Sequence, residues 1–316
     1  MADPQSRRAR SKRSEPPTGR WDGGAGRLPT AEWHRGGERS PNRLAILGPV
    51  LAATDASAEA RAALLVAADL CRMTESRLEV VYVWREPQQA EYYAETIPAP
   101  VHRAFEREAR GVLAQEIAYL RSSGASVSGF HLRYGDPAPE ILGLAAELEA
   151  GTIIIGSRPH GGVRRLLLGS VVEEIAARSP RPVLVRGTDR SAWPPGSVAA
   201  VVDSTQVAFS VWRTAVGLAS QLDLKLRLLV PYGRGNSPLE WMTRFLKRYQ
   251  CLDQVCVEVE PCTGDSMKRL RELAAQGSLI VSCAPSGGVR DRLMPTSRSV
   301  RLLKMSVASV LIVPYS

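Results

Sequence analysis

A glycine-rich stretch between an apolar run and a helix-like run has the residue types of a phosphate-binding loop. Gly156 follows the β-type run 152–155, Gly169-Ser170 precede the helix-like run 171–178, and Gly161-Gly162 lie between them. Glycines let backbone N–H groups approach an anion closely, and a helix N-terminus adds partial positive charge. The spacing therefore predicts a nucleotide or phosphate site in this part of the chain.

Polar groups at the end of this loop are the first candidates for phosphate contact. We expect the main-chain N–H groups of Gly169, Ser170 and Val171 to face phosphate oxygens. The Ser170 hydroxyl either adds a hydrogen bond to a phosphate or only caps the helix that follows. Arg158 either neutralises phosphate charge or is simply exposed to solvent.

Two other residues of the loop limit its chemistry. Pro159 has no N–H donor and fixes φ at about −65°, so the loop must take a shape that proline permits. His160 has no serine or aspartate partner that the sequence identifies, so we do not predict a general base there. Neither a Gly-x4-Gly-Lys-Ser/Thr loop nor a His-x-Gly-His motif occurs. The pattern favours binding over catalysis, and we expect no enzyme.

Three residues at the ends of two other apolar runs are candidates for the rest of a nucleotide. Thr54 and Asp55 end the run that starts at Pro49, and Val83 stands near the end of the run 77–84. Open α/β sheets bind ligands at the carboxyl ends of their strands. Asp55 either accepts hydrogen bonds from ribose hydroxyls or only caps the next helix, and Val83 either touches adenine or packs in the core.

Strand-type and helix-type runs alternate through the first half of the chain and position these residues. The strand-type runs are 49–54, 77–84, 130–134, 152–155 and 182–185. The helix-type runs are 57–73, 102–122, 137–149 and 171–178, with Ser57 and Asp136 as N-cap residues. This order predicts an α/β fold with a doubly wound, Rossmann-like parallel sheet.

The second half repeats this order, which predicts two tandem domains of one fold. Strand-type runs occur at 198–202, 225–230, 279–281 and 309–313, and helix-type runs at 207–222 and, after Gly264-Asp265, through Ala275. Pro159–Arg164 and Pro285–Arg290 are alike in sequence. We predict a tail at 1–43, a first domain at 44–187, a linker at 188–195 and a second domain at 196–316.

Composition and charge narrow the class of protein. The chain has 316 residues, 44% of them hydrophobic, and a net charge of +9. Residues 1–43 hold 10 basic and 5 acidic residues and few aliphatic ones, so we expect a disordered basic tail. No secretory signal or membrane-spanning run is present, and the five cysteines form no Cys-x-x-Cys pair. We expect a cytoplasmic protein with mostly buried free thiols and neither a membrane nor a nucleic-acid partner.

Taken together, these motifs resemble the universal stress protein family, as a tandem two-domain member. Nucleotide-binding members have Gly-x2-Gly-x9-Gly-Ser/Thr after the fourth strand, and Gly156, Gly169 and Ser170 match three of its four positions. Pro159 replaces the second glycine. Asp55 matches the aspartate after the first strand, and Gly135-Asp136 match the Gly-Asp before the third helix.

The resemblance implies an adenine-nucleotide alpha-hydrolase-like fold and an ATP-binding module in stress response, with or without Mg²⁺. It places the nucleotide on Thr54, Asp55, Val83, Gly156, Arg158, Gly161, Gly162, Gly169, Ser170 and Val171. The alternatives that stay open are a nucleotide-free signalling scaffold and a slow ATPase.

The second half departs from the family pattern. Ser282 stands in place of the first glycine, and Pro295-Thr296 replace Gly-Ser. We expect a degenerate copy without nucleotide that pairs with the first half as a built-in dimer partner through the end strands 182–185 and 309–313. A further homodimer of the whole chain is a second expected assembly.

Overall fold

A computed structural model describes residues 48–86, 99–157, 169–187, 193–201, 208–231, 255–262, 266–284 and 309–314. All of these residues belong to one compact unit, Trp33–Ser316. The predicted tail, most of the predicted linker, and Arg158, Gly161 and Gly162 lie outside the described residues.

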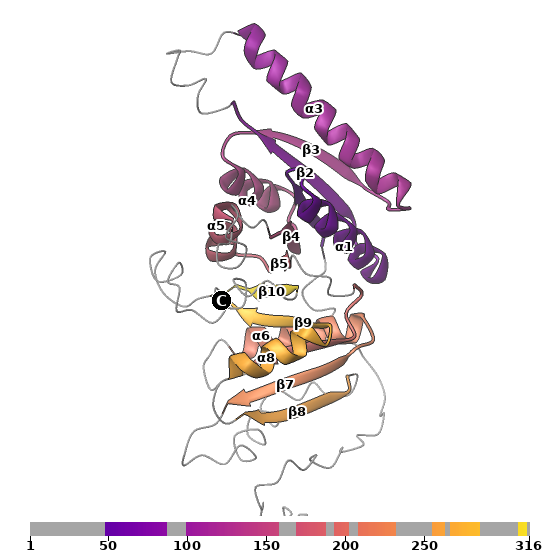
Figure 1. The fold of residues 1–316 in the computed structure, drawn as a ribbon, viewed down its shortest axis with the longest axis vertical. Helices are drawn as coiled ribbons and strands as arrows, with labels where there is room; N and C mark the ends of the chain where they lie inside the picture. Colours follow the sequence, from indigo (N-terminus) through magenta and orange to yellow (C-terminus); the bar gives the residue numbers. More distant parts are fainter. Residues whose placement is uncertain are drawn as a thin grey trace, which may run out of the picture. The chain divides into compact units, whose positions relative to one another are not determined.

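The first half of the chain alternates strands and helices as expected (Figure 1). Its elements are β1 Val50–Thr54, α1 Ala58–Thr74, β2 Leu78–Trp84, α3 Ala99–Ser122, β3 Gly129–Tyr134, α4 Pro137–Glu147, β4 Thr152–Gly156, α5 Ser170–Arg178 and β5 Val183–Arg186.

The second half has one strand more than the sequence pattern predicted. Its elements are β6 Ser197–Val201, α6 Ala208–Gln221, β7 Lys225–Pro231, β8 Val257–Cys262, α8 Ser266–Ala275, β9 Ser278–Cys283 and β10 Val310–Val313. The missed strand is β8, where Val257 and Val259 alternate with Glu258 and Glu260. Alternation of this kind is the signal of a half-buried strand.

All ten strands form one sheet in the order β3-β2-β1-β4-β5-β10-β9-β6-β7-β8. Within each half every pair of neighbouring strands is parallel. The order in the second half repeats that in the first, read outward from the middle of the sheet. The predicted doubly wound α/β fold with parallel strands is confirmed within each half, but the two halves share one sheet.

Helices cover both faces of the sheet, because each strand places alternate side chains on opposite faces. Val50 and Ala52 of β1 pack in one hydrophobic cluster with α1, α3 and α6, whereas Leu51 packs in a second cluster with α4, α5 and α8. The strands are apolar on both faces, as parallel strands between two helix layers must be.

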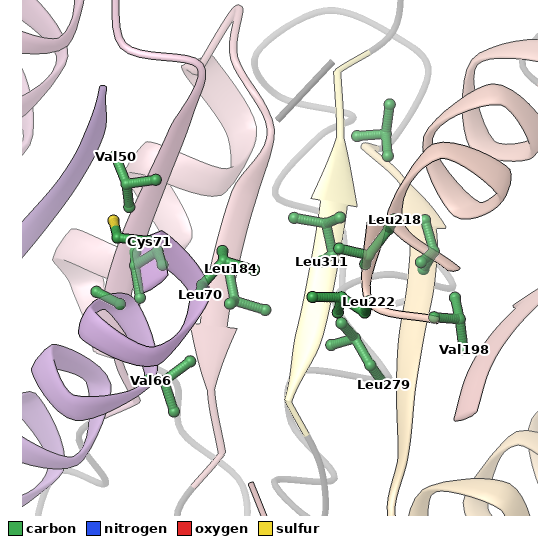
Figure 2. Packing of buried hydrophobic residues seen from close by; sticks show 14 of the residues in the cluster. Val50, Val66, Leu70, Cys71, Leu184, Val198, Leu218, Leu222, Leu279 and Leu311 are labelled. Atoms are coloured by element: carbon green, nitrogen blue, oxygen red, sulfur yellow. The ribbon is translucent and has the colours of Figure 1, made fainter. Parts of the chain in front are cut away.

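The two halves meet where β5 pairs with β10 in an antiparallel ladder, with Leu184 opposite Leu311. Figure 2 shows these two leucines within the first cluster, which contains residues of both halves. Arg186 also donates a hydrogen bond to Ser309 Oγ at 3.5 Å. Over the ranges that the structure describes, no helix is both long and apolar enough to cross a membrane.

Candidate functional site

The sheet reverses its winding between β1 and β4, and this creates the place where a ligand can bind. β1 pairs with β2 on one side and with β4 on the other. The chain leaves β1 for α1 on one face of the sheet and leaves β4 for α5 on the opposite face. Connections that part in this way leave a crevice at the carboxyl ends of the two strands. Thr54 and Asp55 lie on one side of this switch point, and Gly156 lies on the other.

The turn between β1 and α1 is held by hydrogen bonds from its own side chains. Thr54 Oγ1 accepts from the Ala56 amide at 3.0 Å, and Asp55 Oδ1 accepts from the Ser57 amide at 2.9 Å. Ala56 has a φ of 62°, in the left-handed region that an L-residue rarely adopts. Ser57 caps α1 as predicted, because its Oγ accepts from the Ala60 amide at 3.2 Å. The N-cap residue of α1 is thus Ser57 and not Asp55, which is exposed at the carboxyl end of β1.

Gly156 is required by a close approach of two backbones. A Cβ on this residue would lie 2.6 Å from the carbonyl carbon of Glu59 and 2.8 Å from the Ala60 nitrogen. The end of β4 therefore rests directly on the first turn of α1. This contact brings the start of the glycine-rich loop next to the turn that holds Asp55.

The loop ends at the N-terminus of α5, where Gly169 is the N-cap with φ −63° and ψ 141°. Ser170 is the first residue of the helix and its side chain is exposed, so the alternative in which Ser170 caps α5 is wrong. The first amides of a helix have no intrahelical acceptor, and the helix dipole places about half a positive charge there. Gly169, Ser170 and Val171 thus have the backbone arrangement that binds anions at a helix N-terminus.

Val83 and its neighbour Tyr82 lie on opposite faces of β2. Val83 is half-buried and packs with Ala53 and Val171 against the second hydrophobic cluster. Tyr82 lies opposite Thr54 in the β1–β2 ladder. Burial raises the pKa of Tyr82, and the charges of Asp55 and Glu108 raise it further. The Asp55 carboxylate at the end of β1 therefore makes ionisation of the Tyr82 phenol less favourable.

A buried ionic network behind this turn was missed by the reasoning from sequence. Glu116 of α3 is fully buried, and its Oε2 accepts a hydrogen bond from Thr54 Oγ1 at 3.3 Å. Arg61 of α1 pairs with Glu116 Oε1, at 2.8 Å from Nε and 2.7 Å from Nη2. The signal in the sequence was a carboxylate at helical spacing from the buried Ala109, Leu113 and Leu120.

A second cluster, also missed, lies at the carboxyl ends of β2 and β3. Glu86 is 3% exposed, and its Oε1 lies 2.5 Å from His102 Nδ1 at the start of α3. The rings of Trp84, His102 and Tyr134 are in mutual contact, with centroids 4.9 to 5.1 Å apart. Burial opposes ionisation of Glu86, but hydrogen bonds from Tyr134, its own backbone and His102 outweigh it and lower its pKa.

The Gly135-Asp136 pair precedes α4 as predicted, with a different role for the aspartate. Asp136 is the N-cap residue of α4 but makes no capping hydrogen bond through its side chain. Its Oδ1 instead accepts from Arg85 Nη1 at 2.7 Å, which ties the end of β2 to the start of α4. Among the cysteines that the structure describes, Cys71 is buried, Cys256 is exposed, and Cys262 and Cys283 are intermediate, so the expectation of mostly buried thiols is wrong.

Comparison with known proteins finds a family that the first half of the chain matches. Residues 47–186 match the sequence model of the Universal stress protein family. Stress response protein NhaX of Bacillus subtilis is 25% identical over 159 residues, which cover 43% of this chain and 95% of that protein. Universal stress protein YxiE of the same organism is 27% identical over 143 residues, or 43% of this chain and 96% of that protein.

Solved structures share the fold over a larger part of the chain. A universal stress protein from Archaeoglobus fulgidus has a TM-score of 0.65 and 17% identity, and the match covers 85% of this chain and 98% of that one. A universal stress protein from Pseudomonas aeruginosa has a TM-score of 0.55 and 19% identity over 84% of this chain. These structures share the fold, and the family model and the Bacillus relatives confirm the resemblance to the universal stress protein family for the first half of the chain.

Proposed function

We propose, from the membership of residues 47–186 in the universal stress protein family, that the first half of this chain binds ATP or a related adenine nucleotide. The nucleotide would lie at the switch point between β1 and β4. Binding would serve a stress response through a change of shape or partner, without chemistry on the nucleotide.

The observation that carries this proposal is the meeting of three elements at one edge of the sheet. The first turn of α5 offers the amides of Gly169, Ser170 and Val171 to the phosphates. Asp55 stands at the end of β1 for the ribose hydroxyls, with Thr54 beside it. Val83 is only half-buried, which leaves apolar surface for an adenine ring. Gly156 lets the end of β4 approach the first turn of α1 closely, beside the turn that holds Asp55.

The remaining parts of the proposed site come from the sequence. Arg158, Gly161 and Gly162 would complete the loop over the phosphates, with Mg²⁺ as an optional companion of the triphosphate. Pro159 in the same loop favours the second candidate function, a scaffold that binds no nucleotide. The third candidate function is a slow ATPase, and release of inorganic phosphate from ATP would support it.

We further propose that the second half takes the place of a dimer partner. The Bacillus relatives are almost fully covered by a match to less than half of this chain. β10 of the second half pairs with β5 of the first, so the apolar edge of the first half is not left open. The proposed domains are residues 44–187 and 196–316, and residues 188–195 link them. We also propose that the protein is cytoplasmic and that the whole chain forms a homodimer.

Titration of the full chain with ATP and ADP by calorimetry tests the nucleotide site. Two variants at one position separate the backbone from the side chain. Ser170→Pro removes an amide at the first helical position, where proline suits the helix and where α4 itself has Pro137. Ser170→Ala removes only the hydroxyl. We expect Ser170→Pro to weaken ATP binding about tenfold or more, since a hydrogen bond to a charged group is lost, and Ser170→Ala to weaken it less.

The control is the stability of both variants against urea, which should stay close to that of the parent. Equal ATP affinity of parent and Ser170→Pro would remove α5 from the site. A parent chain that binds neither nucleotide, and releases none when heated, would leave the scaffold as the function.

A further inference from the structure

Glu116 is a carboxylate at a place in the fold where an apolar side chain would suffice. It is 0% exposed on the inner side of α3, among Ala109, Leu113 and Leu120. Removing a carboxylate from water is unfavourable unless hydrogen bonds and an opposite charge replace the solvent. Arg61 supplies the charge at 2.7 Å, and Thr54 supplies a hydrogen bond at 3.3 Å. A charge kept at this cost in free energy calls for a role beyond packing.

The Thr54 hydroxyl connects Glu116 to the turn between β1 and α1. A hydroxyl has one proton, and Thr54 gives it to Glu116 Oε2, so its lone pairs are left for the Ala56 amide at 3.0 Å. A charged acceptor polarises the hydroxyl and strengthens the bond that it accepts in turn. That bond stabilises Ala56 at its unfavourable φ of 62°, and Asp55 lies between Thr54 and Ala56 in this turn.

We infer that Glu116 is a positioning residue for the nucleotide site: through Thr54 it holds the β1–α1 turn in the shape that presents Asp55 at the switch point. The inference rests on the nucleotide site proposed above. The competing role for Glu116 is a purely structural link between α3 and α1 through Arg61.

Electrostatics and positioning predict opposite effects of the same substitution. Glu116→Gln keeps the size of the side chain and removes one negative charge behind the turn. Electrostatics alone would then favour an anionic ligand, because less negative charge remains near it. Without the charge of Glu116, the Thr54 hydroxyl would be less polarised and would hold the Ala56 amide less firmly. The turn would loosen and ATP binding would weaken, because Asp55 would no longer be held in place for the ribose.

The experiment titrates the full-length chain with ATP for the parent and three variants. Thr54→Val removes the hydroxyl and leaves the Glu116–Arg61 pair in place. Asp69→Asn is the matched control, because it makes the same carboxylate-to-amide change at an exposed ion pair with Arg72 near the other end of α1. We expect Glu116→Gln and Thr54→Val each to weaken binding about tenfold or more, and Asp69→Asn to leave it unchanged.

A fourth variant combines Glu116→Gln with Thr54→Val. This double variant separates positioning by Glu116 from direct contact of Thr54 with the ligand. If Glu116 acts through Thr54, the double variant loses no more affinity than the weaker-binding single variant. Losses that simply multiply would show two independent effects and would overturn the inference. If Glu116→Gln does not fold, ATP affinity and amide exchange in Thr54→Val decide the same question, and parental values of both would overturn the inference.

A measurement without nucleotide keeps this inference apart from the proposed function. Amide hydrogen exchange at Ala56 and Ser57, followed by NMR, should be faster in Glu116→Gln and in Thr54→Val and unchanged in Asp69→Asn. Parental exchange and parental ATP affinity in Glu116→Gln would show that Glu116 is only structural. A parent that takes no ATP, with faster exchange in the variants, would refute the nucleotide site and leave the control of the turn by Glu116 standing.

Discussion

At the scale of single residues, Gly156 shows why a glycine of the family motif is needed even before a ligand arrives. The backbone of Glu59 occupies the space that a side chain at position 156 would need. We expect Gly156→Ala to lower the free energy of unfolding by about 1–3 kcal/mol, because backbone atoms must move apart to admit the methyl group. Urea unfolding followed by circular dichroism measures this change.

Gly143→Ala is the matched control for that substitution. Gly143 is exposed within α4, and a Cβ there would meet nothing within 4 Å. Alanine should raise the free energy of unfolding by about 0.5–1 kcal/mol, because it is the better helix former. A Gly156→Ala protein as stable as the parent would show that β4 and α1 do not approach as closely as described.

Prediction from sequence succeeded for single residues where the signal was local. Ser57 was predicted as an N-cap because capping depends on neighbours in the chain, and the structure confirms it. Glu116 was missed because its partner Thr54 is 62 residues away, and only the packing of α3 brings the two together. The role of Asp136 was only half predicted, since its position was right but its bond to Arg85 joins residues 51 apart.

At the scale of elements, the start of α3 depends on the charge of one buried carboxyl. Glu86 has a folded-state pKa below its ordinary value of 4.5, so its ionised form stabilises the fold above that value. This stabilisation is lost as the pH falls through the folded-state pKa. Glu86→Gln should therefore be less stable than the parent near pH 7, and the difference should shrink at a second pH well below 4.5.

Urea unfolding of the parent and Glu86→Gln across this pH range measures the difference. Glu174→Gln is the control, because Glu174 forms an exposed pair with Arg178 on α5. Its effect should stay small at each pH, as surface pairs contribute little. A difference between parent and Glu86→Gln that is the same at both pH values would contradict a charged Glu86.

Strands and helices were predicted wherever an apolar run was long enough to stand out. The strands of the first half were found because both of their faces are buried, which gives continuous apolar runs such as Ile153–Ile155. β8 was missed because it is an edge strand with glutamates on alternate positions, and Glu258 and Glu260 pair with basic residues of β7 and α8. Its strand character depends on those neighbours as much as on its own sequence.

At the scale of the whole molecule, the ladder between β5 and β10 joins the two halves in one sheet, so we expect them to unfold together. Leu311 is 1% exposed, lies opposite Leu184, and belongs to a cluster that contains residues of both halves. We expect Leu311→Ala to lower the free energy of unfolding by about 2–5 kcal/mol and to shift the unfolding of both halves together. Far-UV circular dichroism and tryptophan fluorescence should report the same shifted midpoint.

Val101→Ala is the control for this variant, because Val101 is 41% exposed on α3. It should change the stability by no more than about 0.5 kcal/mol. Two separate transitions in Leu311→Ala, with only one of them shifted, would show that the halves unfold independently.

The antiparallel pairing of β5 with β10 also decides at which end of the sheet each half could bind a ligand. Every strand of the first half runs against every strand of the second, so the ends of β1 and β6 point to opposite margins of the shared sheet. The carboxyl end of β9, where Ser282 departs from the family pattern, therefore lies at the end of the sheet opposite Asp55, and the two halves cannot build one nucleotide site from the ends of these strands.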